Sequence, residues 1–267
     1  SATVFKFFEV SDKGDYIITN GSEGAGLMYT NFENAASVSF EGPELSEGMA
    51  FHIPKTELIA VQSRRGDLEL WSSIDGTLVA TFYALNQDDW IVMLPSGFFN
   101  ASSAEAAAAI SVARGIEAIS IENVYDALYR PDLVRAALQG DPDGILNEAT
   151  RDLDLGRILA TGVAPRIVDF KASTTVPGDM VEVSLIVQIA SGGLGRIEWR
   201  VGNTLQGVTE ALNSGQSGTQ TFSRKIFLLP GQNTLSVRVY NSANLIASDP
   251  TTIRVQSGAT EVANPRL

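Results

Sequence analysis

The sequence predicts a mainly β fold with an α-helical connector. Three observations lead to this fold class. Short alternating runs repeat over residues 1–87, an Ala-rich and Leu-rich stretch with helical spacing covers residues 88–163, and alternating runs return over residues 164–258. Residues 259–267 are interpreted as a linker to a domain that the chain does not contain.

Composition narrows the classes of protein. The 267 residues carry 31 acidic and 19 basic side chains, which gives a formal net charge of -12. An acidic chain does not attract phosphate backbones, so nucleic acid is not expected as a partner. No apolar run approaches the ~18 residues of a membrane span, so no membrane partner is expected. We expect a cytoplasmic protein, with the periplasm as the open alternative.

Two groups of four strand-like runs occupy the first segment, with Gly, Asn, Ser and Asp clusters between them. The third run begins at Leu27 in one group and at Leu68 in the next, a shift of 41 residues. This shift matches the period of about 40–45 residues of WD40-type propeller blades. Asp67 and Trp71 stand where such a blade carries its turn Asp and its Trp, whereas Gly26 replaces the Asp in the first group. Closed propellers have about 4–8 blades, so we expect a partial propeller whose missing blades are partners.

The connector is expected to begin with an apolar strand that contains Trp90. An Ala-rich stretch then predicts a helix, with Ser102 or Ser103 as its N-cap and Gly115 as its C-cap. A second helical stretch places Pro131 at or just inside the start of its second half, where proline is well tolerated.

The last helix of the connector is predicted to begin at Asp143 and to stop at Gly162. Several carboxylates lie close together at its start, which raises the question of a calcium site. A calcium loop needs oxygen ligands at alternating positions, a sharp Gly turn and a bidentate Glu. The stretch supplies only two carboxylates before Gly144. We interpret the acidic group as first-turn residues that complement the helix dipole, and we expect no metal. Its members are Asp141, Asp143, Glu148, Asp152 and Asp154.

The third segment predicts an immunoglobulin-like β-sandwich, since about 100 residues hold six or seven short alternating strands. Ile197, Trp199 and Val201 fall on one face of their strand, while Glu198 and Arg200 fall on the other. We expect Trp199 to be the large central core residue rather than a ligand platform, and Glu198 to be a surface carboxylate. The structural core residues expected for the whole chain are Trp71, Trp90, Trp199, Val237 and Tyr240.

Three connections in this segment carry turn signals. The stretch Ser191–Arg196 has three glycines and is predicted to be a hairpin turn. Gly231 follows a proline and is expected to adopt a positive φ. In the stretch after Tyr240 the alternation stops, which indicates a hairpin loop in which Asn241 and Asn244 bond to local backbone.

Four segments closely resemble bacterial caspase-like proteases with WD40-type repeats, the orthocaspase and metacaspase-like group. YRPDLV and GRIEWRV are the most specific matches. The resemblance covers residues 67–267 and implies a non-catalytic region just before the protease domain, with the catalytic His and Cys in that following domain. The segments are DDWIVMLPSGFFNAS (88–102), YDALYRPDLVRAAL (125–138), GGLGRIEWRVGN (192–203) and LLPGQNTLSVRVYNSANLIAS (228–248).

The residues themselves indicate no chemistry. The chain has a single histidine, His52, and no cysteine, and it contains neither a nucleophile elbow nor a phosphate loop. We therefore expect no catalytic residue and no cofactor.

Two functions remain open. The first is a non-catalytic regulatory and scaffolding region of a caspase-like protease, which contacts the protease domain, the missing blades or other proteins. The alternative is a sandwich-type binding module for an external ligand such as a glycan. A glycan-binding module would present exposed aromatic side chains, whereas most aromatic residues here fall at core positions.

Overall fold

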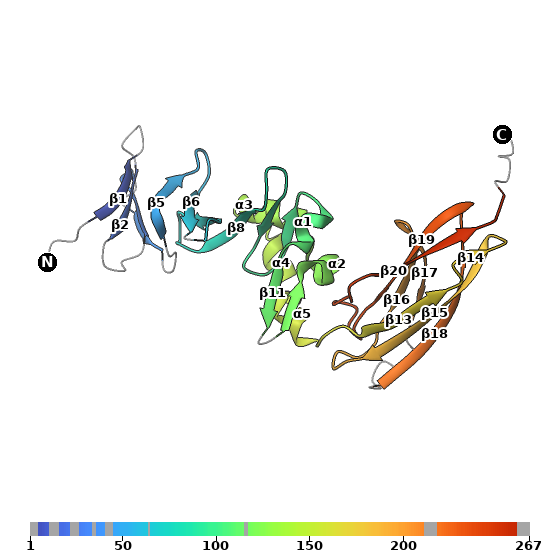
Figure 1. Cartoon of the computed structure of the whole chain (residues 1–267). Helices are drawn as coiled ribbons and strands as arrows, with labels where there is room; N and C mark the ends of the chain where they lie inside the picture. Colours follow the sequence, from blue (N-terminus) through green and yellow to red (C-terminus); the bar gives the residue numbers. More distant parts are fainter. Residues whose placement is uncertain are drawn as a thin grey trace. The chain divides into compact units, whose positions relative to one another are not determined.

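The chain divides into two compact units (Figure 1). The first contains Ser1–Ile110 and Leu128–Leu155, and the second contains Ser111–Ala127 and Gly156–Leu267. None of the helices described is long and apolar enough to cross a membrane. The computed structural model describes residues 5–10, 16–21, 27–33, 36–40, 45–63, 65–114, 117–210 and 218–260.

The first unit begins with a four-stranded antiparallel sheet in which each strand pairs with the next in sequence. This sheet confirms the first predicted group of four strands, the third of which begins at Leu27 as expected. Its members are β1 (Phe5–Val10), β2 (Tyr16–Gly21), β3 (Leu27–Asn31) and β4 (Ala36–Ser39).

A second meander follows, and it has six strands rather than four. The register of β8 and β9 runs from Ala84↔Trp90 to Thr81↔Met93, so the sheet continues past residue 87, where the sequence placed the end of the blades. Continuing the sheet buries the apolar residues Ile91 and Val92. The described residues show no closed propeller. The strands are β5 (Leu45–His52), β6 (Leu58–Ser63), β7 (Leu68–Ser72), β8 (Leu78–Ala84), β9 (Trp90–Met93) and β10 (Phe99–Ala101).

One hydrophobic cluster joins the two meanders. Trp71 is buried in it and meets the ring of Phe40 edge to face, with 6.1 Å between ring centroids. Trp90 lies outside this cluster: it is half-buried and stacks on Phe82 at 6.2 Å. The buried members are Ile18, Tyr29, Phe40, Ala50, Ile59, Val61 and Trp71.

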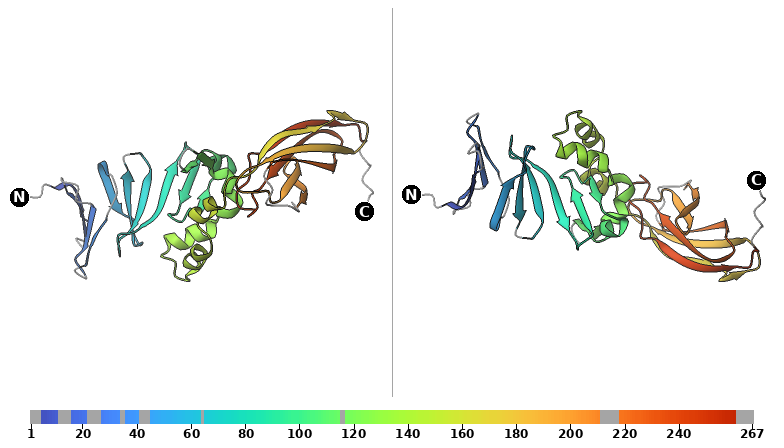
Figure 2. Two further views of the ribbon diagram at one scale, coloured as in Figure 1. Left: turned by 90° about the horizontal axis from the view of Figure 1, so that it is seen from below. Right: turned by 90° about the horizontal axis from the view of Figure 1, so that it is seen from above.

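Short helices complete the first unit. Helix α1 (Ala104–Ala108) has Ser103 as its N-cap, whose side chain accepts a hydrogen bond from the Ala106 amide at 3.0 Å. Helix α3 (Pro131–Leu138) carries Pro131 in its first turn, as predicted, and packs against β8 and β10. These helices lie beside the second sheet in both views of Figure 2.

The single helix predicted between Asp143 and Gly162 is wrong, because two helices form there. Helix α4 (Ile145–Asp152) ends where Leu153 turns to extended backbone, and α5 (Leu155–Ala160) begins after it. The N-cap residue of α4 is Gly144, and Asp141, not Asp143, satisfies the first turn: its carboxylate accepts hydrogen bonds from the backbone amides of Leu146 and Asn147, both at 3.0 Å.

The Ala-rich helix is also shorter than predicted. It ends at Ala108, and the following residues form a hairpin of β11 (Ser111–Arg114) and β12 (Glu117–Ser120). Isoleucine and valine alternate with small residues there, and β-branched side chains favour strands over helices. The proposed C-cap, Gly115, lies outside the described residues. A 3₁₀ turn (Ile121–Val124) and α2 (Tyr125–Leu128) follow the hairpin.

Besides the β11–β12 hairpin, the second unit contains two larger sheets among its described residues. One has three strands in the order β13-β15-β18, and the other has five in the order β14-β20-β19-β16-β17. The two sheets hold eight strands among the described residues, compared with the six or seven predicted, and the two-residue β14 is the shortest of them. The strands are β13 (Arg166–Ala172), β14 (Thr175–Val176), β15 (Met180–Ile189), β16 (Ile197–Val201), β17 (Thr204–Thr209), β18 (Gly218–Phe227), β19 (Gly231–Val239) and β20 (Thr251–Ser257).

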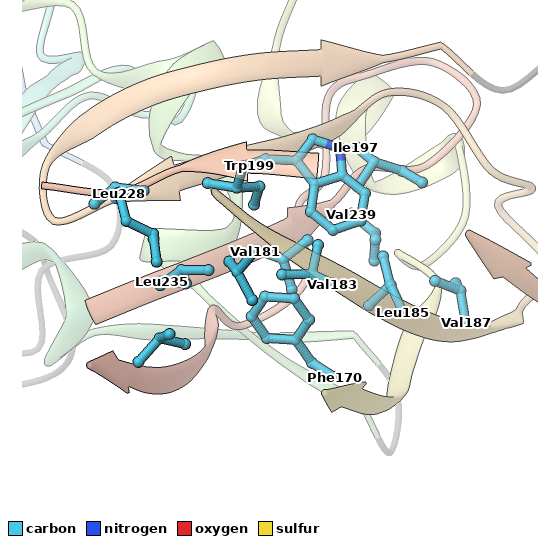
Figure 3. Close-up of a cluster of buried hydrophobic side chains, with 14 of the residues drawn as sticks. Phe170, Val181, Val183, Leu185, Val187, Ile197, Trp199, Leu228, Leu235 and Val239 are labelled. Atoms are coloured by element: carbon cyan, nitrogen blue, oxygen red, sulfur yellow. The ribbon is translucent and has the colours of Figure 1, made fainter. Parts of the chain in front are cut away.

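The two sheets enclose one hydrophobic core, which is the arrangement of a β-sandwich. Phe170, Val183 and Leu185 contribute from the three-stranded sheet, and Trp199 and Val239 contribute from the five-stranded sheet (Figure 3). Alternate residues of each strand supply this core because side chains on a strand point to opposite faces in turn.

The connection at Ser191–Arg196 is not the predicted hairpin turn. It links β15 in one sheet to β16 in the other, so it crosses the sandwich. The turn itself closes through a hydrogen bond from the Gly193 amide to the Ala190 carbonyl, at 3.0 Å. Gly231 begins β19 with φ +87, which confirms the predicted positive φ.

Candidate functional site

Trp199 does not have the exposed ring that a ligand platform requires. This side chain is 0% exposed and its indole N–H donates to the Thr209 hydroxyl at 2.9 Å. The Phe170 ring lies 6.2 Å away, with the two ring planes at 52°. Figure 3 shows both rings among the aliphatic side chains between the sheets. Trp199 therefore supplies packing to the sandwich.

Tyr240 and Arg196 form the centre of a polar group on the second unit. The Arg196 guanidinium lies over the Tyr240 ring, 3.6 Å from its centroid, which is a cation–π contact. Arg196 also pairs with Glu198 at 2.9 Å and with Asp126 at 3.2 Å. The Tyr240 hydroxyl donates to the same Asp126 carboxylate at 2.7 Å. The α2 residue Asp126 is thereby bound to Arg196, just before β16, and to Tyr240, just after β19.

Burial and the paired charges shift the pKa values of Tyr240 and Arg196. Burial, together with the hydrogen bond to the Asp126 carboxylate, raises the pKa of Tyr240 far above its usual value. Burial is the largest single effect on Arg196 and opposes its charged form, but the hydrogen bonds and electrostatic interactions with Glu198 and Tyr240 together outweigh burial, so the pKa of Arg196 is raised. Tyr240 is therefore neutral and Arg196 is charged over the whole physiological range.

Glu198 is not the surface carboxylate that the sequence predicted. It is 7% exposed, and its carboxylate forms ion pairs with Arg196 and, at 3.2 Å, with Arg200. Its cross-strand neighbour Arg238 pairs in turn with Glu122 of the 3₁₀ turn. Glu198 is thus buried on the outward face of β16, among arginines that Glu122 and Asp126 pair with in turn. We call Glu122, Asp126, Arg196, Glu198, Arg238 and Tyr240 the junction network.

The loop after Tyr240 completes this region. The side-chain oxygen of Asn241 accepts a hydrogen bond from the Leu245 backbone amide at 3.0 Å, and its side-chain nitrogen donates to the Thr161 hydroxyl at 2.7 Å. Asn244 accepts from the Arg196 amide at 2.7 Å. The local bonding predicted for Asn241 is confirmed, whereas Asn244 reaches a residue 48 positions away.

This packing requires glycine at position 195, since a Cβ there would collide with the backbone carbonyl oxygen of Asn241.

Exposed apolar side chains gather at one end of the three-stranded sheet. Met180 and Phe227 face each other across β15 and β18 and are 42% and 63% exposed. Leu229, two residues further along the chain, is 71% exposed. We call these three residues the end patch. Exposed clusters of this kind often mark contact sites.

Apart from Glu198 and Tyr240, the individual residues singled out in the sequence belong to neither the junction network nor the end patch. His52 lies in the first unit beside Tyr16 and Tyr29, with ring centroids 4.9 Å and 5.9 Å away. Trp71 is buried and Trp90 is half-buried in the same unit, whereas Val237 and Tyr240 are buried in the second. Among the described residues no three His, Cys, Asp or Glu side chains are placed to hold a metal ion.

Sequence reasoning missed Glu122 and Asp126 as members of the junction network. Asp126 lies 70 residues from Arg196 and 114 residues from Tyr240 in the chain. No local pattern signals such distant partners. The nearest signal was the resemblance itself, since Asp126, Arg196, Glu198 and Tyr240 all fall within its quoted segments.

Comparisons with known proteins add little. No family model and no curated protein matches the chain. Several solved structures match between about a third and nearly all of the chain, but the three described next have TM-scores of 0.25–0.27, which are too low to support an argument about fold or function.

The first is the PKD domain of an M14-like peptidase from Thermoplasmatales archaeon SCGC AB-540-F20. The match has 14% sequence identity and a TM-score of 0.27, and it covers 35% of this chain and 95% of that chain. The second is a Jonesia denitrificans lytic polysaccharide monooxygenase, with 16% identity, 32% of this chain, 56% of that chain and TM-score 0.25. The third is the extracellular domain of the putative one component system BT4673 from B. thetaiotaomicron, with 9% identity, 95% of this chain, 31% of that chain and TM-score 0.26.

Proposed function

We propose that the second unit is a β-sandwich binding module, which acts by contact with a partner and performs no chemistry of its own. The end patch carries this proposal, since Phe227 and Leu229 remain mostly exposed beside a filled core. Leaving large apolar side chains in water costs about 1.5–3 kcal/mol each relative to burial. A partner surface that covers the patch would recover part of that free energy.

Support for a non-catalytic role comes from the sequence and from where its reactive groups lie. The chain has no cysteine, and its one histidine is stacked among tyrosines of the other unit. The charged side chains of the junction network are paired with one another, so they serve to attach residues 117–126 to the sandwich. We interpret the sandwich as immunoglobulin-like and the two meanders as propeller-type blades.

A protein is the partner that we favour, and specifically a caspase-like protease domain. The observation behind this choice is that the family-like residues Asp126, Arg196 and Tyr240 contact one another. The resemblance thus falls on residues that would fix the attachment of such a module rather than on scattered surface positions. We place the protein in the cytoplasm, with the periplasm as the alternative.

An external ligand such as a glycan is the second candidate. A sandwich can bind sugars by stacking them on exposed aromatic rings, and Phe227 offers one such ring. Trp199 is excluded as the platform because it is completely buried.

A binding titration of the whole chain separates the two candidates. A separately produced caspase-like domain should bind, and the double variant Phe227→Ser, Leu229→Ser should weaken binding about tenfold or more, as loss of central apolar contacts does. Leu205→Ser serves as the matched control, because Leu205 is exposed on β17 and lies outside the end patch. A glycan array that gives a Phe227-dependent signal, with no protein binding, would favour the second candidate. Binding of neither class would contradict the module.

A further inference from the structure

The four edge strands of the sandwich differ in how open they are. β13 and β18 border the three-stranded sheet, and β14 and β17 border the five-stranded sheet. β14 has only two residues. The β13 ladder shifts register between Ile167 and Asp169, and the β17 ladder shifts opposite Trp199 and Arg200. Irregularities of this kind discourage further pairing at an edge.

The edge of β17 is also partly covered. The Arg224 guanidinium reaches across from β18 and donates to the Val208 carbonyl at 3.3 Å and to the Thr209 hydroxyl at 3.2 Å. Gly207 makes room for it, since a Cβ there would collide with the same guanidinium.

β18 is the open edge. It pairs with β15 over ten consecutive positions, from Met180↔Phe227 to Ile189↔Gly218, without a register shift. Within the part of the chain that the structure describes, β15 is its one strand partner. A long regular edge presents a row of backbone donors and acceptors to which an extended segment can add.

The charge of β18 selects among the segments that could add there. Its sequence, GTQTFSRKIF, contains Arg224 and Lys225 and no acidic residue, in a chain whose net charge is -12. Lys225 is exposed and Arg224 is half-buried, so basic groups lie on both faces of the strand near its end. Glu182 stands opposite Lys225 on β15, on the side away from the free edge. A second copy of β18 would bring more basic groups and no carboxylate, which is unfavourable across strands.

An apolar anchor adjoins these charges. Phe227 follows Lys225 by two residues, on the same face of β18, and is 63% exposed. An added strand that continued past Lys225 would meet this ring with its next side chain on that face, because side chains on a strand alternate.

We propose that the free edge of β18 binds an acidic extended segment of a partner protein by strand addition. Carboxylates of the segment would lie against Lys225, and an apolar side chain would cover Phe227. This inference rests on the proposed binding function and specifies the chemistry of the partner.

In the test, three ten-residue peptides with blocked ends are titrated into the whole chain. Calorimetry measures their binding, and hydrogen exchange locates the bound peptide. One peptide alternates valine with glutamate, the second alternates valine with lysine, and the third is the glutamate peptide with every second backbone nitrogen methylated. The glutamate peptide should bind about tenfold more tightly than the lysine peptide and slow amide exchange within Gly218–Phe227, whereas the methylated peptide should not bind.

Matched variants locate the effect. Lys225→Gln should weaken binding of the glutamate peptide several-fold, whereas Lys171→Gln, on the opposite edge strand of the same sheet, should leave it unchanged. Equal binding of the lysine peptide, binding of the methylated peptide, or protection outside β18 would overturn the proposal. So would dimerisation of the chain through β18. If the peptides fail while a caspase-like domain still binds in a manner sensitive to Phe227→Ser, the strand-addition proposal fails and the binding function stands.

Discussion

Replacing Trp199 with alanine tests the assignment of the sandwich core. The side chain is fully buried between the sheets, contacts Phe170 and donates its indole N–H to Thr209. Truncating a buried Trp to Ala typically costs ~3–5 kcal/mol, because packing is lost and a cavity remains. A single domain has only about 5–15 kcal/mol of stability in total. For a unit of this size the change corresponds to a fall in melting temperature of roughly 10–20 °C.

Differential scanning calorimetry of the whole chain measures this change, with near-ultraviolet circular dichroism to report on the core. Trp199→Phe is the matched variant: it keeps a ring in the core and should lose clearly less stability than Trp199→Ala. A Trp199→Ala protein that folds and melts like the parent would refute the reasoning, since it would place this side chain outside the core.

The other predictions concern the polar groups. Glu198→Ala should destabilise the chain by about 2 kcal/mol in chemical denaturation, because Arg196 would lose a partly buried partner, whereas exposed Glu182→Ala should change stability by less than about 0.5 kcal/mol. Asp141→Ala should cost about 1 kcal/mol through loss of the α4 cap, seen as reduced helical signal at the same denaturant concentration. Folding raises the pKa of Tyr240 above its ordinary value of 10.0, so its stabilising contribution is complete below that pH and is lost above it; Tyr240→Phe should flatten the fall in melting temperature at alkaline pH. Purified chain should not hydrolyse basic or acidic peptide reporters, and His52→Ala should leave that background unchanged.

The features that the sequence predicted well depend on nearby residues. Val237 was predicted as a core residue; it is buried on the inward face of β19, together with Leu235 and Val239 at alternate positions. Pro131 opens α3 because its fixed φ suits the first helical turn. Gly231 takes a positive φ because a turn between strands requires one there.

The features that the sequence did not predict depend on distant partners or on competing local preferences. Alanine favours helix, but the isoleucine and valine that follow α1 find a hairpin partner in β12, so the helix ends early. Strand alternation places Glu198 outward correctly, yet it cannot show that Arg196 and Arg238 lie over that face. The junction network joins Asp126 to Tyr240 across 114 residues, and only the folded chain brings them together.

The most direct test of the binding account is the hydrogen-exchange footprint of a bound caspase-like domain on the whole chain. The account predicts slower exchange confined to the end patch and the neighbouring β18, around Met180 and from Lys225 to Leu229. Trp199 and its neighbours on β16 should be protected equally with and without the partner. Protection centred on the outward face of β20, around Arg254, or an unchanged footprint at a saturating concentration of the bound domain, would contradict the claim that the end patch is the contact site.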